Sequence, residues 1–102
     1  MSLIPLHPMD FFQQMDAESG RCLVVFSAPA CGGCKRLRRL FDASPALSVP
    51  CFEVNAEDAG FLLEEFNVQH LPGVLCFEAG EYRHDITDIA SIDSIERAIW
   101  DK

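Results

Sequence analysis

Two cysteines, Cys31 and Cys34, lie three positions apart with two glycines between them. At the start of a helix, this spacing holds two thiols near disulfide distance, with one exposed and the other beneath it. The N–H groups and the dipole at a helix N-terminus favour negative charge, so we expect the Cys31 thiolate to be stabilised and its acidity increased. The pattern predicts thiol-disulfide exchange. Cys31 would attack a partner disulfide, and Cys34 would then attack Cys31 to release the reduced partner.

The same pair could instead be half of a zinc or iron–sulfur site. Such a site normally needs two further ligands with a close spacing of their own. The chain has three other cysteines and three histidines, and all of them are scattered. We therefore expect no metal ion and no other bound cofactor, although a site shared between two chains would escape this argument.

The other three cysteines, Cys22, Cys51 and Cys76, lie singly among apolar neighbours. A free cysteine packs like a small hydrophobic residue, so we expect three inert core thiols. Five cysteines with one close pair do not suit a disulfide framework and indicate a reducing compartment. The first eight residues contain no secretory signal, which predicts a cytoplasmic protein unless a leader has been removed.

Length and charge limit the classes of function. A chain of 102 residues predicts one domain over residues 1–102, and its apolar content of 49 % supports a core. The net charge of -8 argues against nucleic acid and anionic membranes as partners, since both need a basic protein surface. Residues 22–26 form an apolar run that is too short to span a bilayer. We expect a soluble monomer.

The elements that position the cysteine pair follow from hydrophobic spacing. Residues 21–27 contain a continuous apolar run, which is typical of a central strand covered on both faces. Helical spacing returns at Leu37, Leu40 and Phe41 and ends by residues 44–45. The pair is therefore predicted to lie at a junction from strand to helix.

The remaining segments alternate between helical and strand patterns. The expected elements are a helix over 8–15, a strand over 49–55, a helix over 57–66, and an antiparallel hairpin of 73–78 and 81–86. A last helix begins at Ser91, or at Asp93 with Glu96 as its capping-box partner. This order, α-β-α-β-α-β-β-α, predicts an α/β fold with a central mixed sheet of about four strands flanked by helices.

Further motifs extend the pattern on either side of the pair. They are Ala28-Pro-Ala-Cys-Gly-Gly-Cys-Lys35, Val54-Asn55, Val68-Gln-His-Leu-Pro72-Gly and Phe77-Glu-Ala-Gly80-Glu. In order and spacing, the chain resembles thioredoxins from Cys22 to Glu81. The resemblance implies a thioredoxin fold in which Pro72 is a cis-proline against the dithiol and the Leu71 backbone pairs with substrate like an added strand.

Four more residues belong to the expected substrate contact beside Leu71 and Pro72. They are Ala30, Gly32, Gly33 and His70. His70 has two interpretations, as a solvated loop histidine or as a side chain that tunes Cys31 or touches substrate.

The chain also departs from the thioredoxin pattern. The tryptophan usual before the first cysteine is Ala30, and the proline usual inside the motif is Gly33. The buried acid of the family is replaced by Val25, and the lysine near it by Glu53. A general base speeds attack by a buried thiol, so we expect Cys34 to resolve mixed disulfides slowly.

Four of the eight basic residues follow the cysteine pair directly, as Lys35, Arg36, Arg38 and Arg39. Positive charge in the first turns of a helix opposes the helix dipole. These side chains could favour the Cys31 thiolate or steer an acidic partner, or they could form an ordinary solvated helix face.

Taken together, the residues predict a thioredoxin-like oxidoreductase that reduces protein disulfides through Cys31 and Cys34. A thiol-based electron donor would restore its dithiol, although two glycines between the cysteines do not fix the direction of the reaction. The alternative is a thioredoxin-fold module that binds a peptide at the Pro72 edge, with little redox turnover.

Overall fold

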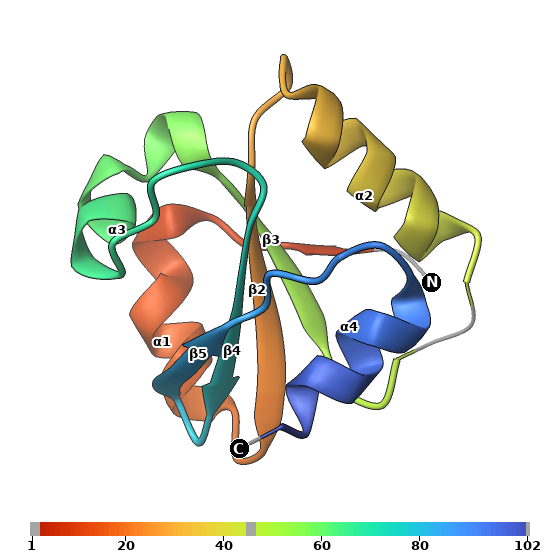
Figure 1. Ribbon diagram of the computed structural model, residues 1–102. Helices are drawn as coiled ribbons and strands as arrows, with labels where there is room; N and C mark the ends of the chain where they lie inside the picture. Colours follow the sequence, from red (N-terminus) through yellow and green to blue (C-terminus); the bar gives the residue numbers. More distant parts are fainter. Residues whose placement is uncertain (1–2, 45–46, 102) are drawn as a thin grey trace.

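A five-stranded mixed sheet forms the centre of the computed structural model, which describes residues 3–44 and 47–101 (Figure 1). In spatial order, the strands are β1 (Ile4–Pro5), β3 (Cys51–Asn55), β2 (Arg21–Ser27), β4 (Gly73–Glu78) and β5 (Glu81–Asp85). The first three are parallel, whereas β4 runs antiparallel to β2 and β5 antiparallel to β4. The prediction of a mixed sheet is therefore confirmed, with β1 as a strand beyond the expected four.

Helices cover both faces of this sheet. In Figure 1, α1 (Phe11–Ala17) and α3 (Gly60–Glu65) lie on one side, and α2 (Gly32–Asp42) and α4 (Ile92–Ile99) lie on the other. Two short 3-10 turns, Pro8–Asp10 and Ala56–Asp58, precede α1 and α3. The predicted helices over 8–15 and 57–66 are thus each divided into a tight turn and a shorter α-helix. Pro45, which was expected to follow α2, lies outside the described residues.

Strand β2 is covered on both faces, as its continuous apolar run predicted. Side chains alternate across a strand, so Cys22, Val24 and Phe26 pack with α1 and α3. Leu23 and Val25 point the other way and pack with α2 and α4. This central strand ends directly before the cysteine pair and gives the pair a rigid base.

The last helix begins with a cap that differs from one of the two predictions. The Ser91 side chain accepts a hydrogen bond from the Ser94 N–H, and the Ser94 hydroxyl accepts one from the Ser91 N–H. The alternative start at Asp93 with Glu96 is therefore wrong. The Glu96 carboxylate instead accepts hydrogen bonds from the Ser48 N–H at 3.0 Å and the Trp100 indole N–H at 2.7 Å. It ties α4 to the segment before β3.

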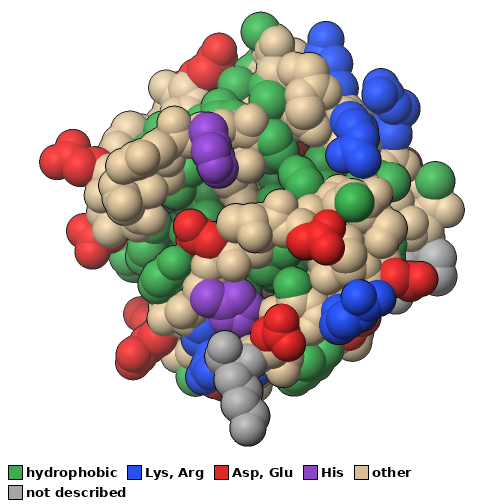
Figure 2. All heavy atoms as spheres, viewed as in Figure 1, with side chains coloured by type: hydrophobic (Ala, Val, Ile, Leu, Met, Phe, Trp, Pro, Cys, Tyr) green, Lys and Arg blue, Asp and Glu red, His purple; other side chains and the backbone are tan. Residues whose placement is uncertain are grey.

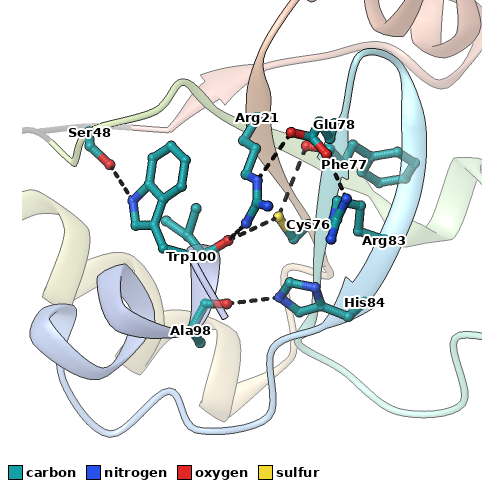
Figure 3. Close-up of polar contacts among 10 residues, drawn as sticks. Arg21, Ser48, Cys76, Phe77, Glu78, Arg83, His84, Ala98 and Trp100 are labelled. Atoms are coloured by element: carbon teal, nitrogen blue, oxygen red, sulfur yellow. Dashed lines mark hydrogen bonds and ion pairs between the residues drawn. The ribbon is translucent and has the colours of Figure 1, made fainter. Parts of the chain in front are cut away.

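Polar side chains hold the other end of α4 against the sheet (Figure 3). This end of α4 lies away from the start of α2 (Figure 1). The Arg21 guanidinium donates to the Ile99 carbonyl, and His84 Nε2 donates to the Ala98 carbonyl at 2.8 Å. Arg21 also lies 5.1 Å from the centre of a Trp100 ring. We call this group the Arg21 cluster, made of Arg21, Glu78, Arg83, His84 and Trp100. Its cations complement the negative end of the α4 dipole.

Candidate active site

Cys31 is the N-cap residue of α2, as the strand-to-helix junction predicted. The chain leaves β2 at Ser27 and turns, and the Cys31 N–H donates to the Ala28 carbonyl at 3.2 Å. The Cys31 sulfur accepts a hydrogen bond from the Cys34 N–H at 3.1 Å. An N–H at a helix N-terminus is a donor without a partner inside the helix, and here a sulfur takes the place of the usual capping oxygen. This N–H can stabilise negative charge on Cys31 when the pair is reduced.

Cys34 lies beneath Cys31, with 2 % of its surface exposed, whereas Cys31 is half-buried. The two are joined by a disulfide, and their Cα atoms are 5.2 Å apart. Cys34 shares the buried face of α2 with Leu37 and Phe41, which pack onto the sheet. The spacing of these apolar residues therefore sets which thiol is accessible and which is covered.

Pro72 lies against the first turn of α2. The peptide bond between Leu71 and Pro72 is cis. A Cβ atom added to Gly33 would meet the Pro72 Cδ atom at 3.1 Å, so the two segments are in close contact at this point. The structure thus brings Pro72 to the cysteine pair although 38 positions separate it from Cys34 in the sequence.

Leu71 presents unpaired backbone groups beside the pair. Its side chain packs against the α1 and α3 face of the core, and its N–H and C=O have no hydrogen-bond partner within residues 3–44 and 47–101. His70 is exposed and lines a cavity of about 230 Å³ together with Pro72 and Thr87. An unpaired backbone edge beside a cavity is a place where an extended peptide can add as a strand.

Ala30, Gly32 and Gly33 surround the cysteines on the solvent side, and all three are exposed. A Cβ atom at Gly32 would meet nothing within 4 Å, in contrast to Gly33. The approach to Cys31 is therefore lined by small residues.

Val25 and Glu53, which replace the buried acid and the lysine of the thioredoxin pattern, are adjacent in the sheet. Val25 and Glu53 are register partners on β2 and β3, and Val25 is 1 % exposed in an apolar cluster. The Glu53 carboxylate accepts a hydrogen bond from the Ser27 hydroxyl at 2.8 Å and pairs with Arg38 at 2.5 Å. The sequence interpretation missed both partners of Glu53. One sequence signal could have placed Arg38 near the cysteine pair: it follows Cys34 by four positions, on the same side of α2.

A large cavity lies beside the Glu53 carboxylate and not at the cysteine pair. It has a volume of about 690 Å³, and Ser27, Arg38 and Glu53 line it together with His7 and Asn55. Neither Cys31 nor Cys34 belongs to its lining. The two thiols that could carry out disulfide exchange thus lie outside this cavity.

The three single cysteines are buried thiols, as predicted. Burial raises the pKa of the Cys22 and Cys51 thiols from 9.0 to about 12, and it also raises the pKa of Cys76. The Cys51 thiol lies 3.6 Å from the Val49 carbonyl, and Cys76 lies 3.9 Å from the Ile99 carbonyl. Carbonyl oxygens accept hydrogen bonds from a thiol and repel a thiolate, so these contacts favour the neutral form.

Among residues 3–44 and 47–101, no group of three or more histidine, cysteine or acidic side chains is arranged to hold a metal ion. Within the same residues, every helix is too short or too polar to cross a bilayer.

Comparison with known proteins places the chain within one family. The Thioredoxin family model matches residues 2–101. Over 86 residues the chain is 28 % identical to thioredoxin M3, chloroplastic, of Oryza sativa subsp. japonica, a match that covers 78 % of the chain and 49 % of the relative. It is 30 % identical over 67 residues to thioredoxin M-type, chloroplastic, of Zea mays, covering 63 % of the chain and 40 % of the relative. The chain thus spans about half or less of these relatives.

Solved structures share the fold at low sequence identity. A mutant thioredoxin from Halobacterium salinarum NRC-1 has a TM-score of 0.79 at 17 % identity, with 97 % of this chain and 91 % of that chain covered. Thioredoxin F from spinach chloroplast also has a TM-score of 0.79, at 16 % identity, with 96 % and 90 % covered. The expected thioredoxin fold is therefore confirmed.

Proposed function

Because the chain belongs to the thioredoxin family, we propose that it is a thiol-disulfide oxidoreductase that reduces protein disulfides with Cys31 and Cys34. The observation that carries this proposal is the Cys34 N–H aimed at the Cys31 sulfur at 3.1 Å, at the N-terminus of α2. This contact can stabilise the form of the thiol that attacks a disulfide.

In the proposed reaction, the reduced Cys31 thiolate attacks one sulfur of a partner disulfide, and the other partner sulfur leaves as a thiolate that takes up a proton. Cys34 then loses its proton and attacks the Cys31 sulfur, so that the partner's remaining sulfur leaves and is protonated. The partner gains two electrons and two protons, and the protein is left with the Cys31–Cys34 disulfide. A thiol-based donor restores the dithiol by the reverse exchange.

The partner segment docks in extended form along Leu71, whose unpaired backbone groups support strand addition. Its sulfur approaches Cys31 between Pro72 and the small residues Ala30, Gly32 and Gly33. Exposed His70 lines the cavity beyond Pro72 and is available to a longer segment. Recognition in this arrangement depends on backbone hydrogen bonds and on access, with few large side chains from the protein.

The resolving step is proposed to be slow. Val25 supplies no proton acceptor, and the neighbouring Glu53 carboxylate is engaged by Ser27 and Arg38. Cys34 must therefore lose its proton without a free carboxylate at position 25 or 53. Mixed disulfides with partners should persist longer than they would with a base in place.

We propose that the protein works as a monomer in a reducing, cytoplasmic compartment, with a protein disulfide and a thiol donor as its partners. Three unpaired buried thiols support this location, since oxidising compartments favour paired cysteines. The net charge of -8 supports neither nucleic acid nor membrane as a partner.

The test is reduction of insulin disulfides with dithiothreitol as donor, comparing the parent chain with Cys31→Ser. We expect the parent to accelerate reduction and Cys31→Ser to fall to the rate of dithiothreitol alone. Cys76→Ala is the matched control, because it removes a thiol far from the pair and should retain the activity. An inactive parent, or equal activity in Cys31→Ser, would contradict the proposal. If the parent is inactive and an extended peptide binds both the parent and Cys31→Ser, the result would instead support the peptide-binding module.

A further inference from the structure

Three exposed cations follow the cysteine pair along α2 and form what we call the cationic face, made of Lys35, Arg36 and Arg39. None of the three has an ion-pair partner within the described ranges 3–44 and 47–101. Arg38 is different, because it pairs with Glu53. In the space-filling view, Lys and Arg side chains gather where α2 lies in the ribbon diagram (Figure 2).

The stability of α2 does not account for this face. Lys35 stands near the N-terminus of the helix, where a positive charge opposes the dipole. Arg39 follows it by four positions, so the two like charges are neighbours on the helix surface and repel each other. The first turn of α2 contains no acidic residue to offset them. Arg39 alone lies in the last turn, where a cation is favourable.

The cationic face also contrasts with the rest of the protein. The chain has 16 acidic and 8 basic residues, and four of the basic residues lie on α2. The single acidic residue of α2 is Asp42, at the end of the helix away from the pair. Ala30 and Gly32 have no long side chain that would separate the pair from these cations. The surface beside Cys31 is therefore locally positive on an acidic molecule.

We infer that the partner disulfide is carried by an acidic segment, whose carboxylates meet the cationic face while its cysteine lies at Cys31. This inference rests on the proposed thiol-disulfide exchange and adds the chemical class of its substrate. Within the part of the chain that the structure describes, the only polar side-chain contact of these three residues is a long hydrogen bond from Arg36 to the Ala90 carbonyl, at 3.4 Å. Their charges are thus available to a partner.

The expected consequence is faster encounter with acidic partners. Opposite charges steer association and raise its rate, and the effect decreases as salt screens them. We expect acidic segments to react about tenfold faster than neutral ones at low ionic strength, and basic segments to react more slowly than neutral ones. The difference should shrink strongly when the Debye length falls from about 30 Å to about 3 Å.

The experiment uses three peptides of one length, in which the cysteine is flanked by Asp, Asn or Lys. Each cysteine is held in a mixed disulfide with 2-nitro-5-thiobenzoate, whose release is followed by absorbance. The full chain is reduced, freed of reductant, and mixed with each peptide at about 0.01 M and about 1 M ionic strength. The dithiol supplies the two electrons, so each reaction yields protein disulfide, peptide thiol and free nitrothiobenzoate.

Charge reversal on the helix provides the decisive comparison. Lys35→Glu should remove the preference for the Asp peptide, and the double variant Lys35→Glu/Arg39→Glu should reverse it. Arg97→Glu is the matched control, since it makes the same change in net charge from an exposed position in the last turn of α4. It should retain the parent's preference.

The outcomes separate the two proposals. If the Asn peptide reacts and the three peptides differ by less than about twofold at low ionic strength, the inference is wrong while the proposed exchange stands. Equal loss of preference in Arg97→Glu and Lys35→Glu would also overturn it, because net charge would then explain the effect. If no peptide releases nitrothiobenzoate, the proposed function itself fails.

Discussion

The sulfurs of Cys31 and Cys76 contact opposite ends of two helices, Cys31 as the N-cap of α2 and Cys76 from strand β4 at the C-terminus of α4. At the N-terminus of α2, the Cys31 sulfur accepts a hydrogen bond from the Cys34 N–H. At the C-terminus of α4, the Cys76 thiol faces the Ile99 carbonyl instead (Figure 3). N–H groups favour a thiolate and carbonyl groups favour a thiol. The two ends of a helix thus offer a sulfur opposite partners, an N–H that favours the thiolate and a carbonyl that favours the thiol.

Burial is the main cause of the raised pKa values of the three core thiols. Cys31 is half-buried and reachable, whereas Cys22, Cys51 and Cys76 are fully enclosed. Their raised pKa values leave almost no thiolate at neutral pH. The three core thiols therefore do not compete with Cys31 as nucleophiles. The predictions that follow test this contrast between the reactive pair and the inert core.

The largest effect is expected from separating the two thiols of the pair. Cys34→Ser should accumulate a stable mixed disulfide between Cys31 and a peptide disulfide, because nothing resolves it. Cys31→Ser should form such an adduct on the order of 10³-fold more slowly, since Cys34 is buried. Mass spectrometry of the intact protein after acid quenching measures both adducts. Comparable rates for the two variants would show that Cys31 is not the privileged nucleophile.

The second prediction concerns the pH dependence of stability. Cys22 and Cys51 have folded pKa values of about 12 and an ordinary value of 9.0. Between these values the unfolded chain loses the protons and the folded chain keeps them, so unfolding becomes easier as pH rises. Each thiol should lower the free energy of unfolding by about 1.4 kcal/mol per pH unit in this window and have no effect well below pH 9.

Urea unfolding at several pH values between 8 and about 11 measures this slope. The variant Cys22→Ala/Cys51→Ala should be less stable at pH 8 because it leaves small cavities, but its slope should be shallower than the parent's. Identical slopes would contradict the assignment of inert, strongly shifted thiols to the core.

The third prediction tests whether the Arg21 cluster contributes only to the stability of the protein and not to the reaction of the cysteine pair. Arg21 caps α4 at Ile99, pairs with Glu78 and lies over Trp100. Arg21→Ala should lower the free energy of unfolding by about 1–3 kcal/mol, since half-buried polar groups lose their partner. Nitrothiobenzoate release by the reduced pair should be unchanged. A marked fall in that rate at a temperature where the variant is folded would connect the two ends of the molecule.

The smallest effect is expected from the glycines between the cysteines. Gly33→Ala places a Cβ atom 3.1 Å from the Pro72 Cδ atom, so Pro72 or the helix start must shift by a few tenths of an ångström. We expect kcat/KM for insulin reduction to fall roughly fivefold. Gly32→Ala is the control, since its Cβ atom meets nothing within 4 Å. If both variants lower kcat/KM equally, contact with Pro72 does not position the pair.

Local patterns were sufficient to predict most of the helices and strands and the place of the cysteine pair at the start of a helix. The apolar run of β2 and the helical spacing after the cysteines are patterns within a few residues of one another. Both predicted elements are confirmed. The short strand Ile4–Pro5 was missed because two residues carry no periodicity, and a proline is tolerated there at the sheet edge. The Ser91 cap was one of two predictions and is confirmed, whereas its partner Ser94 was missed because Asp93 and Glu96 also fit a capping-box pattern.

The surroundings of Glu53 show what sequence spacing cannot supply. Its partners come from β2 and α2, and their meeting depends on the register of β3 against β2 and on the packing of α2 over both. Such contacts join Ser27, Arg38 and Glu53 across 26 and 15 positions. Only the assembled sheet determines them.

The central claim is that Cys31 and Cys34 form an exchange-competent dithiol beside three inert thiols. Its most direct test is a redox titration in glutathione buffers, with alkylation and mass spectrometry reporting each cysteine separately. We predict a reversible two-electron transition confined to Cys31 and Cys34, while Cys22, Cys51 and Cys76 remain unmodified in the folded protein. The account is contradicted if the pair never forms a disulfide, or if it reacts no more selectively than the three single cysteines.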